Sequence, residues 1–161
     1  MEEFQLARNK ALEKIKLADH MLTQTYPLVK DPKLLVAVIE NIFLALTNGI
    51  ASILHYERTF KRVPPFVDNF ENKFAVFRQN CVERHSLGRE TIDLISEIKE
   101  AVIAHRKSPV EFARKDNFVI CQDDYKLKTI SVEKIKNYIS STKSFLNKVS
   151  TIVSKNETIF R

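Results

Sequence analysis

Two segments of the sequence place arginine and histidine close enough along the chain to act on one phosphate. Six residues separate Arg78 from His85, and His105 is followed at once by Arg106. Arginine holds phosphate oxygens through its planar guanidinium, and histidine transfers protons near neutral pH. We take these four residues as candidate catalytic residues for proton transfer at a bound phosphate.

A structural role also accounts for the same residues, and the common occurrence of such residues at helix ends favours it. Arg78 and His85 fall near the expected end of a helix, where positive side chains interact favourably with the helix dipole. His105 closes the apolar stripe of another expected helix, so its ring can lie at the edge of the core. Both interpretations stay open.

Basic residues continue beyond His105 and around a proline break. Arg106 and Lys107 precede Ser108–Pro109, and Arg114 and Lys115 follow, which puts four cations within ten residues. Loops are where binding residues concentrate. We therefore predict that Lys107, Arg114 and Lys115 contact nucleic acid. The net charge of +6, from 26 basic and 20 acidic residues, agrees with a polyanionic partner but also occurs in proteins that bind none.

Motifs for other chemistries are missing. The 161 residues contain two glycines and neither GxxxxGK[ST] nor GxGxxG, so a phosphate-binding loop is excluded. HExxH, GxSxG and CxxC are absent as well, and we expect no metal and no cofactor. Cys81 and Cys121 fit buried thiols in a reducing compartment. With an acidic N-terminus unlike a signal peptide, the expected location is the cytoplasm.

The hydrophobic periodicity predicts an all-α protein, a five-helix bundle with an up-and-down four-helix core. We expect a single domain over 1–161. Asp31, Asp68 or Asn69, and Ser131 are the candidate N-caps. The strand-like residues around Gln122–Asp124 predict a small β-hairpin over 117–130, before the last helix. The expected helices cover approximately residues 3–26, 32–61, 69–81, 89–107 and 131–154.

Two segments allow more than one interpretation. Leu34–Leu54 has about the length of a membrane-spanning helix, but polar residues interrupt it. We expect the buried central helix of a bundle rather than a membrane segment. The hairpin carries Phe118 and Tyr125, which are able to stack on a base, although a lid packed on the bundle explains them too.

A polar seam runs along the expected second helix. Asn41, Asn48 and His55 stand seven residues apart, with Ala45 and Ser52 on the same stripe, so they share one helix face. Small residues and amides on such a face favour close helix packing, with hydrogen bonds between helices. The alternative is a polar groove or the seam of a homodimer.

The order of these elements resembles the HEPN superfamily of helical bundles: a long first helix, an apolar second helix, and a histidine–arginine corner before a final amphipathic helix. The resemblance implies RNA cleavage or RNA binding, a homodimer, and in some members a nucleotidyltransferase partner. The family's hallmark is arginine, four to six residues, then histidine. Here only Arg78 and His85 have this spacing, whereas the corner reads Lys99, five residues, His105 and Arg106.

Two functions follow from the sequence. The first is a HEPN-like protein that binds RNA or cleaves it without metal. The alternative is a non-enzymatic helical homodimer or a module that docks a protein partner.

Overall fold

The computed structural model describes residues 1–107, 111–114, 117–121 and 127–155. The predicted helical bundle with a small β unit before the last helix is confirmed. Its elements, in chain order, are α1 (Glu3–His20), the π-helical turn η1 (Met21–Thr25), α2 (Tyr26–Val29), α3 (Pro32–Thr59), α4 (Phe70–Asn80), α5 (Arg89–Lys107), β1 (Glu111–Arg114), β2 (Asn117–Cys121), β3 (Leu127–Ser131) and α6 (Val132–Ser154).

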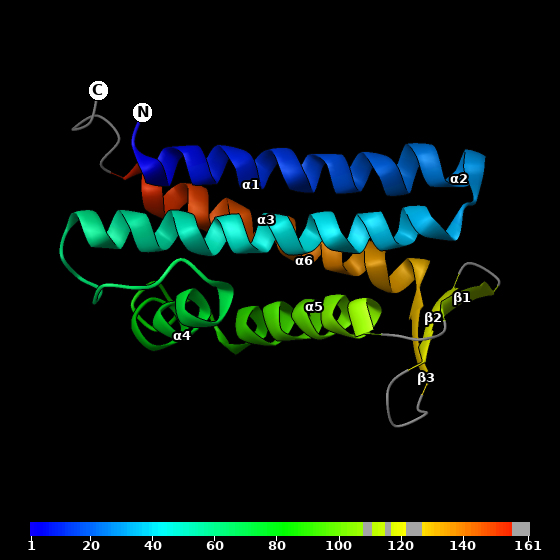
Figure 1. Cartoon of the computed structure of the whole chain (residues 1–161). Coiled ribbons are helices and arrows are strands. Elements are labelled where there is room, and N and C mark those ends of the chain that lie inside the picture. Colours follow the sequence, from blue (N-terminus) through cyan, green and yellow to red (C-terminus); the bar gives the residue numbers. More distant parts are fainter. Residues whose placement is uncertain (108–110, 115–116, 122–126, 156–161) are drawn as a thin grey trace.

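Four long helices, α1, α3, α5 and α6, alternate in direction and form the predicted up-and-down core (Figure 1). The short helix α4 lies in the connection between α3 and α5. The strands sit at the end of the bundle opposite the N-terminus (Figure 1). α3 is the central helix, because it packs against α1, α4, α5 and α6.

Small residues let α1 and α3 approach closely. Ala11 and Ala18 on α1, and Ala45 on α3, are completely buried. The buried Ser52 hydroxyl donates a hydrogen bond to the Phe4 carbonyl oxygen, at 2.7 Å. This bond satisfies two polar groups inside the core and fixes the position of α1 along α3.

Three of the predicted N-caps form. The side chains of Asp31, Asn69 and Ser131 accept hydrogen bonds from backbone amides two or three residues further on, at 3.0, 2.8 and 3.0 Å. They begin α3, α4 and α6. Each cap satisfies an amide that has no partner within its helix.

The first helix was expected to end before Pro27, and this is wrong. Pro27 has no N–H to donate to the Thr23 carbonyl, so α-helical pairing fails there. The chain inserts η1 instead, in which the Tyr26 amide binds the Met21 carbonyl five residues back. The helix then continues to Val29 and ends at Lys30, which adopts a left-handed conformation with φ of 53°.

The β unit has one strand more than predicted. β2 and β3 pair antiparallel with Phe118 opposite Ile130, which confirms a hairpin within 117–130. β1 pairs antiparallel with the other edge of β2, so the sheet has the order β1-β2-β3. The expected turn at Gln122–Asp124 and Tyr125 lies outside the described residues.

α3 is long and apolar enough to cross a membrane, with a mean hydropathy of 1.9 over its most apolar 18 residues. Half of that window is buried within the bundle. A central core helix passes the same test, and the burial of α3 against four other helices agrees with that role.

Gly49 lies where α3 packs closely against α6. A Cβ atom there would lie 2.8 Å from Leu146 Cδ2 and 2.9 Å from Phe145 Cε2. We expect Gly49→Ala to lower the free energy of unfolding by about 1 kcal/mol in urea denaturation, because overpacking by ~1–3 kcal/mol exceeds the helix propensity of alanine. Adding Leu146→Val, which removes the Cδ2 atom, should recover part of the loss. Equal or higher stability of Gly49→Ala alone would show that this contact is loose.

Candidate functional site

Arg78 lies in the last turn of α4, and its side chain is exposed. The guanidinium carbon is 5.3 Å from the centre of the Phe74 ring, a cation–π contact along the same helix. Arg78 also lines a cavity of about 320 Å³ between α4 and α5, together with Lys99 and the carboxylates of Glu71 and Glu100. Lys99 Nζ is 2.6 Å from Glu71 Oε1. The cations of this cavity are therefore balanced by carboxylates.

His85 follows α4 in the turn before α5 and has a different partner. Its Nε2 forms a short hydrogen bond to Oε1 of Glu57, near the end of α3. The His85 side chain is only 9% exposed. Arg78 and His85 thus have different partners in the described structure, Phe74 and Glu57.

Glu57 is a fully buried carboxylate surrounded by positive or protonatable groups. Its Oε2 is 3.0 Å from Arg84 Nη1 and 3.6 Å from Arg62 Nη1. The Arg62 amide also binds the Glu57 carbonyl at 3.0 Å. Together with His85, these contacts tie the segment after α3 and the turn after α4 to the end of α3. A buried carboxylate is tolerated only with such partners.

Sequence analysis missed Glu57, although one signal was available. Glu57 stands three and four residues after Leu54 and Ile53, both completely buried, and therefore continues the apolar face of α3. An acid on such a face requires buried partners. The sequence does not show where those partners come from, because Arg84 and His85 lie 27 and 28 residues away.

The second predicted pair lies at the end of α5. Arg106 Nη2 is 3.2 Å from Glu40 Oε2, which joins the end of α5 to α3. His105 is partly buried on α5. Of the predicted nucleic-acid contacts, Lys107 is the last residue of α5 and Arg114 the last residue of β1. Lys115 lies outside the described residues.

The polar seam of α3 packs against the first helix in part as expected, through the hydrogen bond from Ser52 to the Phe4 carbonyl. Asn41 and Asn48 each donate to the carbonyl four residues back in α3, at 2.8 Å, and Asn41 also lies 3.9 Å from the Met21 sulfur in η1. His55 Nδ1 lies 3.0 Å from Glu3 Oε2 on α1. Partial burial lowers the pKa of His55, although Glu3 opposes this shift.

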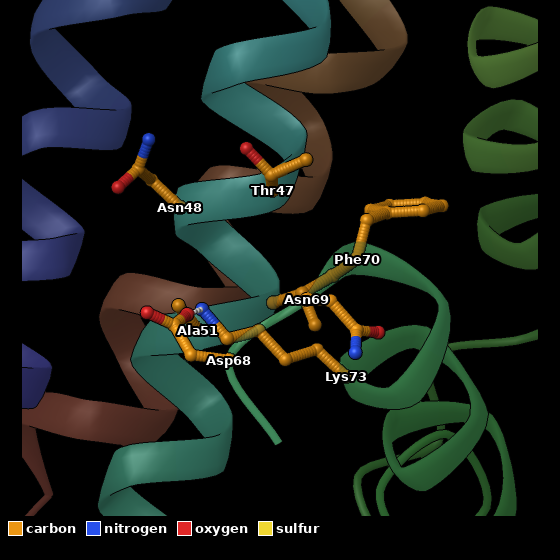
Figure 2. A pocket seen from close by; sticks show the side chains of 8 residues that line it. Thr47, Asn48, Ala51, Asp68, Asn69, Phe70 and Lys73 are labelled. Atoms are coloured by element: carbon orange, nitrogen blue, oxygen red, sulfur yellow. Dashed lines mark ion pairs between the residues drawn. The ribbon is translucent and has the colours of Figure 1, made fainter. Parts of the chain in front are cut away.

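A cavity of about 260 Å³ opens beside this seam, between α3 and the start of α4. Figure 2 shows Thr47 and Asn48 on one wall and the pair Asp68–Lys73 on another. Lys73 Nζ is 2.5 Å from Asp68 Oδ1, and this hydrogen bond lowers the pKa of Asp68. Thr47 and Asn48 both donate to the Leu44 carbonyl. The polar groups of the cavity thus have partners within the chain.

α6 carries a large unbalanced surface that sequence analysis did not single out. Of its four lysines, Lys134 pairs with Glu97 at 2.9 Å and Lys143 with Asp19 at 2.5 Å. Lys136 and Lys148, and Lys155 after the helix, form no ion pair with a described residue. Glu133, in the first turn, is the one exposed acidic residue of α6. We call the exposed residues beyond it, with the C-cap, the outer face of α6: Lys136, Asn137, Ser140, Ser141, Lys143, Ser144, Asn147, Lys148, Thr151 and Lys155.

Metal binding has no support within the described ranges, where no three His, Cys, Asp or Glu side chains gather as a metal site would need. No protein-family model matches the sequence, and neither a curated protein nor a solved structure matches the chain. The resemblance to the HEPN superfamily, and the homodimer and nucleotidyltransferase partner that it implies, stay predictions.

Because Glu57 is buried and Glu40 is not, we expect substitution of these two glutamates of α3 to change the free energy of unfolding by different amounts. We expect Glu57→Gln to lower the free energy of unfolding by about 2–3 kcal/mol, because His85, Arg84 and Arg62 lose the charge that compensates them. Glu40→Gln is the matched control. It breaks an ion pair whose arginine is 60% exposed, so we expect a change below about 1 kcal/mol. Equal losses in urea denaturation would mean that the Glu57 cluster contributes no more than a surface pair.

Cys81 predicts a loss of stability at high pH. Burial, reinforced by the negative charge of Glu57, raises the pKa of this thiol from 9.0 to about 12. Above pH 9 the Cys81 thiol loses its proton in the unfolded chain but keeps it in the folded chain. The free energy of unfolding therefore falls by about 1.4 kcal/mol per pH unit until pH 12. We expect Cys81→Ala to show a shallower fall in unfolding free energy between about pH 9.5 and 11. Parallel curves for the two proteins would contradict this assignment.

Proposed function

We propose that this chain binds RNA through the phosphate backbone, using the outer face of α6, and does not cleave it. The observation that carries the proposal is the complete lack of acidic residues between Glu133 and Lys155. Over that stretch the exposed side chains are lysine, serine, asparagine and threonine. Lysines attract phosphates, and hydroxyl and amide groups donate hydrogen bonds to phosphate and sugar oxygens.

The charge of the chain is concentrated on this helix. α6 contains four lysines and one glutamate, which is half of the net charge of +6. α1, by contrast, contains four basic and four acidic residues if the N-terminal Glu2 is included and His20 is taken as neutral. A local excess of positive charge attracts a polyanion more strongly than the same charge spread over the molecule.

The candidate catalytic residues favour binding over cleavage. His85 is held by the buried Glu57, and Arg78 stands over Phe74 on α4. Arg106 is paired with Glu40. A general base and a phosphate-binding arginine have to reach the same phosphate, and these contacts direct the side chains elsewhere. We infer an RNA-binding module rather than a nuclease.

The proposal predicts that RNA affinity falls as salt rises and that lysines of α6 account for part of this fall. We expect binding of a short RNA with paired and unpaired segments to weaken as salt rises. In fluorescence anisotropy, Lys136→Gln/Lys148→Gln should make the slope of log Kobs against log salt concentration shallower by about 1.4–1.8, since each phosphate contact contributes about 0.7–0.9.

The matched control removes the same charge elsewhere. Lys10→Gln/Lys33→Gln also replaces two exposed lysines, on α1 and at the start of α3, and should leave the slope within about 0.3 of the unmodified protein. An equal decrease of the slope in both variants would mean that binding depends on the overall charge of the protein rather than on α6. Absence of binding at low salt would overturn the proposed function altogether.

A further inference from the structure

The outer face of α6 is divided into a central polar strip and two lysine rows. At about 100° per residue, Ser140, Ser144 and Asn147 share the middle of the exposed arc with Thr151. Lys136 and Lys143 lie along one edge of this strip, seven residues apart. Lys148 and Lys155 lie along the other edge, also seven residues apart. Lys143 is paired with Asp19. The positive charge beside the hydroxyl and amide groups that has no ion pair with a described residue therefore lies at Lys136 on one side and at Lys148 and Lys155 on the other.

α6 presents this face without projecting from the bundle. Nine of its residues are buried, from Ile135 to Val153, and the helix packs against α1, α3 and α5. Only the outer half of a cylinder about 10–12 Å across is therefore accessible. Such a surface can lie on a wide, shallow groove but cannot reach the floor of a deep one.

The shape of this surface discriminates between nucleic acids. The minor groove of B-form DNA is only about 6 Å wide and does not admit a helix, and its major groove, which does, presents base edges but no 2′-hydroxyl groups. The minor groove of A-form RNA is wide and shallow and displays 2′-hydroxyl groups. Binding of single strands relies on exposed aromatic side chains, whereas both aromatic residues of α6, Tyr138 and Phe145, are buried.

We propose that the outer face of α6 recognises double-helical RNA across its minor groove. The central strip would contact 2′-hydroxyl groups, and the lysine rows would contact the phosphates of the two strands that border the groove. This inference rests on the proposed function, because it names the class of RNA that the same face binds. It specifies recognition of helix shape and backbone, with no reading of base sequence.

The test compares three ligands with the full-length chain: a short mixed-sequence RNA duplex, the DNA duplex of the same sequence, and one RNA strand alone. We expect the RNA duplex to bind at least tenfold more tightly than either of the others at moderate salt. Ser140→Ala/Ser144→Ala removes two hydroxyls and no charge. It should weaken binding of the RNA duplex about tenfold, since two hydrogen bonds are lost, and change binding of the DNA duplex less than twofold.

The variant should fold as the unmodified protein does, because alanine has a higher helix propensity than serine. Asn9→Ala/Gln24→Ala, which truncates two exposed polar residues on α1 and η1, is the control and should alter no affinity. Equal binding of all three ligands, or tightest binding of the single strand, would overturn this inference and leave the proposed function standing. Failure of all three ligands to bind would overturn both.

Discussion

Burial of α3 is the constraint on which the arrangement of the other helices depends. Fourteen residues of this helix are buried, and they occur around most of its circumference rather than on one stripe. A helix that is apolar nearly all round is stable in water only when other helices surround it. α1, α5 and α6 provide this cover, and α4 closes part of the remaining face near the end of α3. The candidate sites lie on or between the helices that surround α3.

Glu57 shows how the same constraint determines the chemistry near the end of α3. A carboxylate on a face that is otherwise apolar has to draw its partners from the chain segments that cover it. Arg62, Arg84 and His85 fill that role. Because His85 is engaged in this way, it is held on the side of the turn that faces α3, while Arg78 points away along α4. The arginine–histidine spacing in the sequence is thus compatible with two residues that serve separate contacts.

Much of the fold could be predicted because helix periodicity and burial coincide. Apolar residues at helical spacing in the first segment, Phe4, Ala11, Ile15, Ala18, Leu22 and Tyr26, are buried, as are Ile135, Ile139, Leu146, Val149 and Val153 of the last helix. The sequence did not predict the features that depend on contacts between residues far apart along the chain. β1 is a four-residue segment with a charge at each end, and only its pairing with β2 makes it a strand. The partners of Glu57 and the ion pair of Arg106 with Glu40 likewise depend on helices meeting in space, which spacing along the chain does not encode.

α5 and α6 differ in the charge of their exposed surfaces. Both helices bury one side against α3, and α5 has four basic and four acidic residues, with His105 taken as neutral. Such a mixture is sufficient for solubility and adds stabilising pairs along a helix, as Arg89 and Asp93 illustrate. Folding therefore does not require a helix surface free of acids. On α6 two of the four lysines pair with acids of other helices. The remaining positive charge adds repulsion to the isolated chain, which a polyanion across the face would relieve, as the proposed RNA binding requires.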